Sequence, residues 1–175
     1  PEPFQPAAAE GALANFAADF SAASPSDLLG LVLFDVTDPA ERMSIAELLA
    51  TGLPVSVAVD PLTANASERA AELRAAGFEV GLLTSSLPHG ARPADLAVNF
   101  NAWTEAVPEA ALIVEAPEVT FQNSRGLSQH IIGLAQDGGY GLITHDIGLN
   151  TADQLAEGAG LLRAESYRLI DGGKE

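Results

Sequence analysis

The chain has 175 residues, with 8 basic and 24 acidic side chains, and a formal net charge of −16 at neutral pH. That charge argues against binding to DNA, RNA or anionic membrane surfaces, which requires clustered Lys and Arg. Cysteine is absent, which excludes disulfides and thiolate chemistry. The length fits a single domain. No apolar run reaches the roughly 18 residues of a membrane-spanning helix.

The first part of the chain, residues 1–27, is rich in Ala, Pro and Ser. Three prolines among the first six residues disfavour a helix there, and such tracts behave as extended spacers. Leu13, Phe16 and Phe20 then recur at helical spacing and predict a short helix. We expect this part to be a tether, partly disordered or docked onto a β/α domain formed by residues 28–175.

From Leu28 onward, apolar runs typical of buried strands alternate with helical patterns. The expected strands are 28–35, 53–60, 78–83, 111–116, 140–146 and 161–165. This order predicts an α/β fold with a parallel sheet and right-handed crossovers, either open and doubly wound or curled into a barrel.

Helix starts are marked by short polar residues followed by an acid or amide three positions later. Asp38, with Pro39 after it and Glu41 as the partner, predicts a capping box for the first crossover helix. Ser124 predicts the start of a later helix that ends at Gly138 and Gly139.

Polar side chains follow most of the expected strands. Asp35, Asp60, Glu115, His145 and Asp146 each come at or just after the end of an apolar run. In a parallel β/α array these ends share one edge, where ligands bind. Converging carboxylates can bind a cation or transfer protons, and they can equally cap helices and solvate loops. Nucleotide-binding glycine motifs and a GxSxG nucleophile elbow are absent.

Three segments carry a resemblance to a known family. They are VLFD at 32–35, LPVSVAVDPLTANASERAAELRAAGFEVGLL at 53–83 and NSRGLSQHIIGLAQDGGYGLITHDIGLNT at 123–151. Over roughly Leu29 to Glu165 the chain resembles the divergent polysaccharide deacetylases, relatives of the NodB-like carbohydrate deacetylases, and most of all their alphaproteobacterial subset. The resemblance implies a distorted (β/α) barrel, a divalent cation such as zinc, and hydrolysis of acetyl groups from a polysaccharide.

The same resemblance implies a periplasmic or cell-envelope location, with a membrane anchor upstream of Pro1. It also implies that the last β/α unit is missing here and that more chain follows Glu175. An incomplete barrel leaves a sheet edge exposed, so we also expect a homodimer formed by strand pairing.

The sequence departs from the family pattern where the metal would be held. Active relatives end the first strand in Asp-Asp, whereas this chain has Asp35-Val36. The family has a His after the third strand, where this chain has Thr-Ser-Ser at 84–86, and His89 comes a few residues later. The family has another His before the Ser-Arg turn, where this chain has Phe-Gln-Asn at 121–123. Because an ion that activates water needs about three protein donors, we expect no metal cofactor.

We therefore favour a divergent, deacetylase-like protein of the envelope whose metal site is degenerate, whose deacetylase activity is lost, and which binds a carbohydrate or a peptidoglycan-type glycan. Ser124, Arg125 and His145 are the candidate substrate-binding residues. Trp103 and Tyr140 are candidates for stacking on a sugar, or else belong to the core.

The alternative is an active carbohydrate deacetylase with a rearranged site. Asp35 and Asp146 are then the candidate catalytic residues, with His145 beside them. Arg125 binds an acyl oxygen of the substrate in this alternative. Zinc or another divalent cation is the cofactor in that case, with His89 as the remaining candidate ligand.

Overall fold

The computed structural model describes residues 11–21, 29–84, 91–117, 121–146 and 151–170. It contains six strands: β1 (Leu31–Phe34), β2 (Val55–Val59), β3 (Glu79–Thr84), β4 (Leu112–Glu115), β5 (Gly141–His145) and β6 (Arg163–Ser166). Its helices are α1 (Ala12–Phe16), α2 (Ile45–Ala50), α3 (Ala66–Ala75), α4 (Pro93–Ala106), the 3₁₀ turn η1 (Phe121–Asn123), α5 (Arg125–Gly138) and α6 (Thr151–Gly158).

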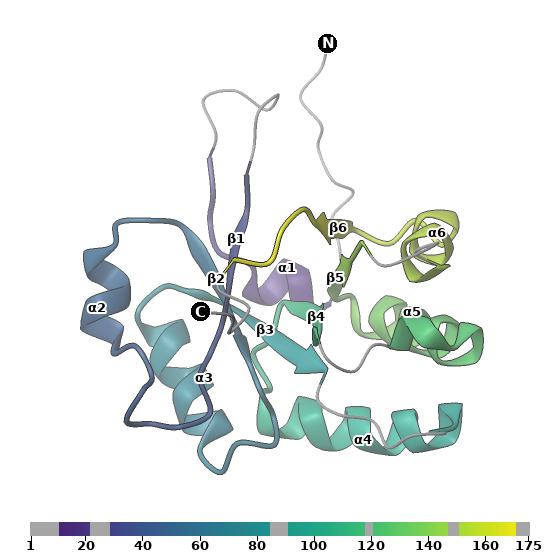
Figure 1. The fold of residues 1–175 in the computed structure, drawn as a ribbon, viewed down its shortest axis with the longest axis horizontal. Coiled ribbons are helices and arrows are strands. Elements are labelled where there is room, and N and C mark those ends of the chain that lie inside the picture. Colours follow the sequence, from purple (N-terminus) through teal and green to yellow (C-terminus); the bar gives the residue numbers. More distant parts are fainter. Residues whose placement is uncertain (1–10, 22–28, 85–90, 118–120, 147–150, 171–175) are drawn as a thin grey trace.

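The strands form one parallel sheet in the order β1-β2-β3-β4-β5-β6, each strand pairing with the next one in sequence. The sheet curls into a half-barrel, with α2 to α6 arranged in an arc around its outer side and β1 and β6 at its two edges (Figure 1). This confirms the expected α/β class and, of the two architectures left open, the barrel-like one.

The strand register separates an outer face from an inner face. Outward residues such as Val57, Leu82 and Ile113 join the core beneath the helices. Aligned partners in a parallel pair point to the same side, so Ser56 and its neighbours lie inside the curl. The inner face consists of Val32, Phe34, Ser56, Ala58, Glu79, Gly81, Leu83, Leu112, Val114, Gly141, Ile143, His145, Ala164 and Ser166.

The first crossover helix starts later than the sequence predicted. Ser44 is the N-cap of α2, and its hydroxyl accepts a hydrogen bond from the backbone N–H of Glu47, whose carboxylate accepts one from the Ser44 N–H. The predicted cap, Asp38, instead accepts a hydrogen bond from the Ala40 N–H within a local turn. Two similar capping patterns lie six residues apart, and the prediction that selected the first one was wrong.

The ends of α5 agree with the sequence prediction. The Ser124 hydroxyl accepts from the Leu127 N–H at the start of the helix, and Gly139 stops it in a left-handed conformation with φ 66°. Trp103 is 2% exposed and belongs to the core beneath α4, and Tyr140 packs edge-on against Phe100. Both aromatic residues therefore have core positions.

The short helix α1 packs at the start of the strands. The Leu13 N–H donates to the Gly139 carbonyl at 2.8 Å, and the Ala18 N–H donates to the Glu79 carboxylate at 3.2 Å. Gly11 enters the helix at φ 131°, and a Cβ there would stand 2.6 Å from the Gly138 carbonyl oxygen. A residue with a side chain at position 11 would therefore obstruct this packing.

Candidate functional site

Asp35, at the carboxyl end of β1, is held by two arginines. Arg69 of α3 forms a two-pronged contact, with its Nε and Nη2 atoms each 3.0 Å from one Asp35 oxygen. The Nε of Arg42 lies 3.1 Å from Asp35 Oδ2. The side chains of Asp35 and Arg69 are each 4% exposed. Both oxygens of the candidate catalytic carboxylate are thus used in a buried ion pair.

The ion pair follows from the direction in which Asp35 points. Asp35 comes one residue after the inward-facing Phe34. Because side chains alternate along a strand, the Asp35 side chain points to the outer face, toward the helices. On α3, Ala66, Arg69, Ala70 and Leu73 are the buried residues, at the spacing of one helix face. A guanidinium in that face needs an anionic partner, and Asp35 supplies it. The missed signal in the sequence was an arginine within an otherwise apolar helical stripe.

Glu115, at the end of β4, is a second buried carboxylate with different partners. It is fully buried, and its Oε2 accepts hydrogen bonds from the Gln122 side-chain amide and from the His145 backbone N–H. Among the described residues, no hydrogen-bond partner faces its Oε1. Burial raises the pKa of Glu115 above the usual value, and the bonds from Gln122 and His145 oppose that shift only in part.

His145 is the candidate residue that the structure places on the inner face. Its Nε2 lies 2.9 Å from the Glu115 backbone carbonyl, and its Nδ1 lies 2.8 Å from the hydroxyl of Ser166 on β6. Phe34 approaches from the opposite edge of the curl, with the two ring centroids 6.4 Å apart. Ser166 was not among the sequence candidates, because nothing in the pattern around it distinguishes it from a strand-end serine.

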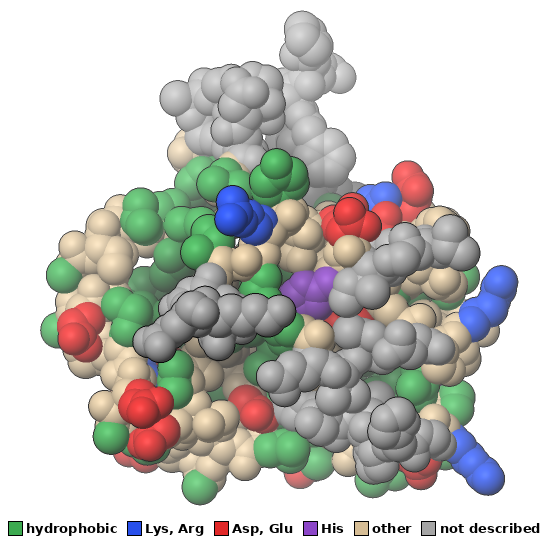
Figure 2. All heavy atoms as spheres, in the orientation of Figure 1, with side chains coloured by type: hydrophobic (Ala, Val, Ile, Leu, Met, Phe, Trp, Pro, Cys, Tyr) green, Lys and Arg blue, Asp and Glu red, His purple; other side chains and the backbone are tan. Residues whose placement is uncertain are grey.

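The other candidate residues that the structure describes do not join His145. Asp146 is exposed, directly after β5, and Ser124 and Arg125 stand at the start of α5, with Arg125 exposed. Ser124 is engaged in capping that helix. His89 lies outside the described residues. Acidic side chains are scattered over the visible face rather than gathered at one point (Figure 2).

The donor set at this end of the sheet does not fit a zinc ion. A zinc site needs three or four nitrogen, sulfur or oxygen donors that are free to face the metal, and the Asp35 oxygens face Arg69 and Arg42. Within the described ranges, no three His, Asp or Glu side chains gather in a way that would hold a metal ion.

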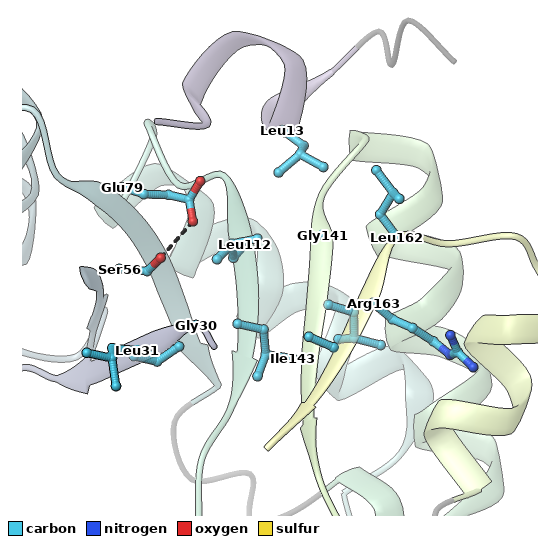
Figure 3. A pocket seen from close by; sticks show the side chains of 13 residues that line it. Leu13, Gly30, Leu31, Ser56, Glu79, Leu112, Gly141, Ile143, Leu162 and Arg163 are labelled. Atoms are coloured by element: carbon cyan, nitrogen blue, oxygen red, sulfur yellow. Dashed lines mark hydrogen bonds between the residues drawn. The ribbon is translucent and has the colours of Figure 1, made fainter. Parts of the chain in front are cut away.

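A groove runs along the inner face near the starts of the strands (Figure 3). Its volume is about 290 Å³, and its lining is largely apolar, with the Ser56 hydroxyl donating to the Glu79 carboxylate at 2.7 Å on one side. Leu13 of α1 lies over the groove and is part of its lining (Figure 3). Ile143 and Ala164, which line it, precede His145 and Ser166 by two residues on the same strands.

Comparison with known proteins supports the fold alone. No protein-family model and no curated protein matches the chain. A solved structure of an uncharacterized protein from Agrobacterium tumefaciens C58 is similar, with a TM-score of 0.69 and 11% sequence identity over 93% of this chain and 71% of that one. At that identity the likeness extends to the β/α architecture.

None of the helices in the described part of the chain is long and apolar enough to cross a bilayer.

Proposed function

We propose that the chain is a divergent member of the polysaccharide deacetylase class, acting in the cell envelope, that has lost metal-dependent deacetylation and binds a glycan at the carboxyl ends of its strands. The observation that carries the proposal is the buried pairing of Asp35 with Arg69 and Arg42. In the resembling family this position supplies the base or the metal ligand, and here its lone pairs are directed at guanidinium groups.

The pairing is costly to undo. Separating a buried, hydrogen-bonded ion pair typically costs about 3–5 kcal/mol, because one charge is left without compensation. A metal ion or a water molecule at Asp35 would have to displace two arginines, one of which is also bonded to the Met43 carbonyl at 2.8 Å. Glycan binding needs no such displacement, since Phe34 and Ser166, both half-buried on the inner face, offer an aromatic ring and a hydroxyl.

The test measures metal content and glycan binding on the same preparation of the 175-residue chain. We expect less than a tenth of an equivalent of zinc after dialysis against zinc-containing buffer, and no acetate release from acetylated chito-oligosaccharides. We expect binding of the same oligosaccharides by calorimetry, weakened at least tenfold by Phe34→Ala and unchanged by the matched substitution Phe20→Ala, because Phe20 is exposed beyond α1.

Two results would contradict the proposal in different ways. One equivalent of zinc, lost in Asp35→Ala, together with acetate release, would establish the active-deacetylase alternative. Absence of any oligosaccharide binding would remove the glycan-binding part while leaving the loss of metal chemistry in place.

A further inference from the structure

The hydrogen bonds of His145 fix which ring nitrogen carries its proton. The Glu115 backbone carbonyl can only accept, so the His145 Nε2 at 2.9 Å must carry the hydrogen. In the neutral imidazole, Nδ1 then has a lone pair, and the Ser166 hydroxyl 2.8 Å away donates its proton to it. The same three-part order of hydroxyl, imidazole and orienting acceptor activates nucleophilic serines on unrelated folds.

His145 is held at two points, ring and backbone, by one residue. The Glu115 carbonyl accepts from the ring, and the Glu115 Oε2 accepts from the His145 backbone N–H at 3.1 Å. His145 is 8% exposed, so the ring is enclosed. Ser166 is half-buried at the end of the edge strand β6. The base is therefore pre-oriented, and the nucleophile is the less buried member of the pair.

We infer that Ser166 and His145 form a metal-independent nucleophile–base pair that accepts acyl groups from carboxylic esters. The inference does not depend on the glycan proposal. Ser166 Oγ attacks the ester carbonyl carbon while its proton passes to His145 Nδ1. The tetrahedral intermediate collapses, the C–O bond to the alcohol breaks, and the imidazolium returns the proton to the departing alkoxide. In the second half of the reaction, His145 takes a proton from water and the oxygen of that water attacks the acyl carbon. The bond from the acyl carbon to Ser166 Oγ breaks, His145 returns the proton to Oγ, and the carboxylic acid leaves.

The surroundings favour an uncharged, apolar acyl group. Phe34, Ile143 and Ala164 are the apolar inner-face neighbours of the pair, and the last two continue into the groove of about 290 Å³. Two residues along a strand correspond to about 7 Å, so the groove starts within reach of an acyl chain carried on Ser166. An anionic acyl group is disfavoured by the net charge of −16 and by the use of Arg42 and Arg69 at Asp35.

The test is covalent labelling of the whole chain with an alkyl fluorophosphonate, read by intact mass and by peptide mapping. Ser166 Oγ would form the bond to phosphorus, fluoride would leave, and His145 would take the proton. We expect one adduct per chain, mapped to Ser166, and at least a tenfold slower reaction in Ser166→Ala and in His145→Gln. Ser67→Ala is the control, since Ser67 is an exposed hydroxyl on α3 that does not line the groove, and it should react as the unaltered chain does.

The rate of p-nitrophenyl butyrate hydrolysis should follow the labelling rate in the same four proteins. It should be alike in the unaltered chain and the control, and at least tenfold lower in Ser166→Ala and His145→Gln. The inference is overturned if no adduct forms, if the adduct maps to another residue, or if either Ser166→Ala or His145→Gln reacts as fast as the unaltered chain. Peptide mapping of the unaltered protein decides the matter even if a variant does not fold.

Discussion

Two buried carboxylates, at the carboxyl ends of β1 and β4, show how hydrogen-bond and ion-pair partners decide the behaviour of a residue. Asp35 is compensated by two guanidinium groups, whereas the hydrogen bonds that Glu115 accepts from the described residues come from neutral donors, the Gln122 amide and the His145 N–H. Neutral donors do not offset the loss of hydration of a full charge. For that reason burial raises the pKa of Glu115.

The raised pKa makes stability depend on pH with a defined sign. Between the ordinary value of 4.5 and the higher folded-state pKa, the folded chain binds more protons than the unfolded chain. The free energy of unfolding therefore falls as pH rises through this window. We expect Glu115→Gln, which keeps an acceptor for the His145 N–H, to remove this decline.

The measurement is urea denaturation at a series of pH values from 4.5 upward. The difference in unfolding free energy between Glu115→Gln and the unaltered chain should grow in favour of the variant as pH rises. Glu68→Gln, at an exposed position of α3, removes one negative charge without touching the buried site. If the two variants show the same pH dependence, Glu115 is not the source of it.

At the scale of single elements, the sequence predicted the strands and most helix ends, because these depend on residues close together in the chain. The left-handed Gly139 after α5 and the Ser124 cap are examples. The start of α2 was missed because Asp38 and Ser44 both carry an acid three residues later. In the structure the Asp38 carboxylate is bonded within a local turn to the Ala40 N–H, and the cap of α2 is Ser44.

The candidate site was less predictable than the elements. His145 and Ser166 lie 21 residues apart and meet only through the β5–β6 register. Arg69 meets Asp35 across 34 residues because α3 packs beside β2, the strand next to β1, and the Arg69 side chain reaches the end of β1. These pairings depend on which strand lies next to which and on which face a side chain points to, and neither is contained in a local pattern.

The two capping patterns make a direct comparison possible. Replacing a cap serine by alanine typically costs about 0.5–2 kcal/mol, and Ser44→Ala should destabilise the chain by about 1 kcal/mol, because it removes the hydroxyl that the Glu47 N–H bonds to. Asp38→Ala should change stability by less than about 0.5 kcal/mol, as exposed surface substitutions usually do. Denaturant midpoints of the two variants provide the measurement. A larger cost for Asp38→Ala would mean that α2 extends back to the predicted cap.

At the scale of the whole molecule, the half-barrel leaves strands β1 and β6 without a strand partner on one side within the described residues. Unpaired strand edges offer backbone hydrogen-bonding groups to another chain. Exposed apolar side chains stand close in the chain to both edge strands, Leu29 before β1 and Tyr167 and Ile170 after β6, at 78%, 94% and 76% exposure. A contact between the edge strands of two copies would therefore form backbone hydrogen bonds and would also bury exposed apolar side chains.

We expect a homodimer at micromolar concentration, measured by light scattering coupled to size exclusion. The double substitution Tyr167→Glu and Ile170→Glu should shift the equilibrium to monomer, because it replaces two exposed apolar side chains that directly follow the edge strand β6 with charges that resist burial in an interface. Val98→Glu removes an equally exposed apolar side chain, 71% accessible on α4, and should leave the dimer intact. A monomer across the concentration range, or equal disruption by Val98→Glu, would show that the open edges do not pair and that the dimer contact, if any, lies elsewhere on the surface.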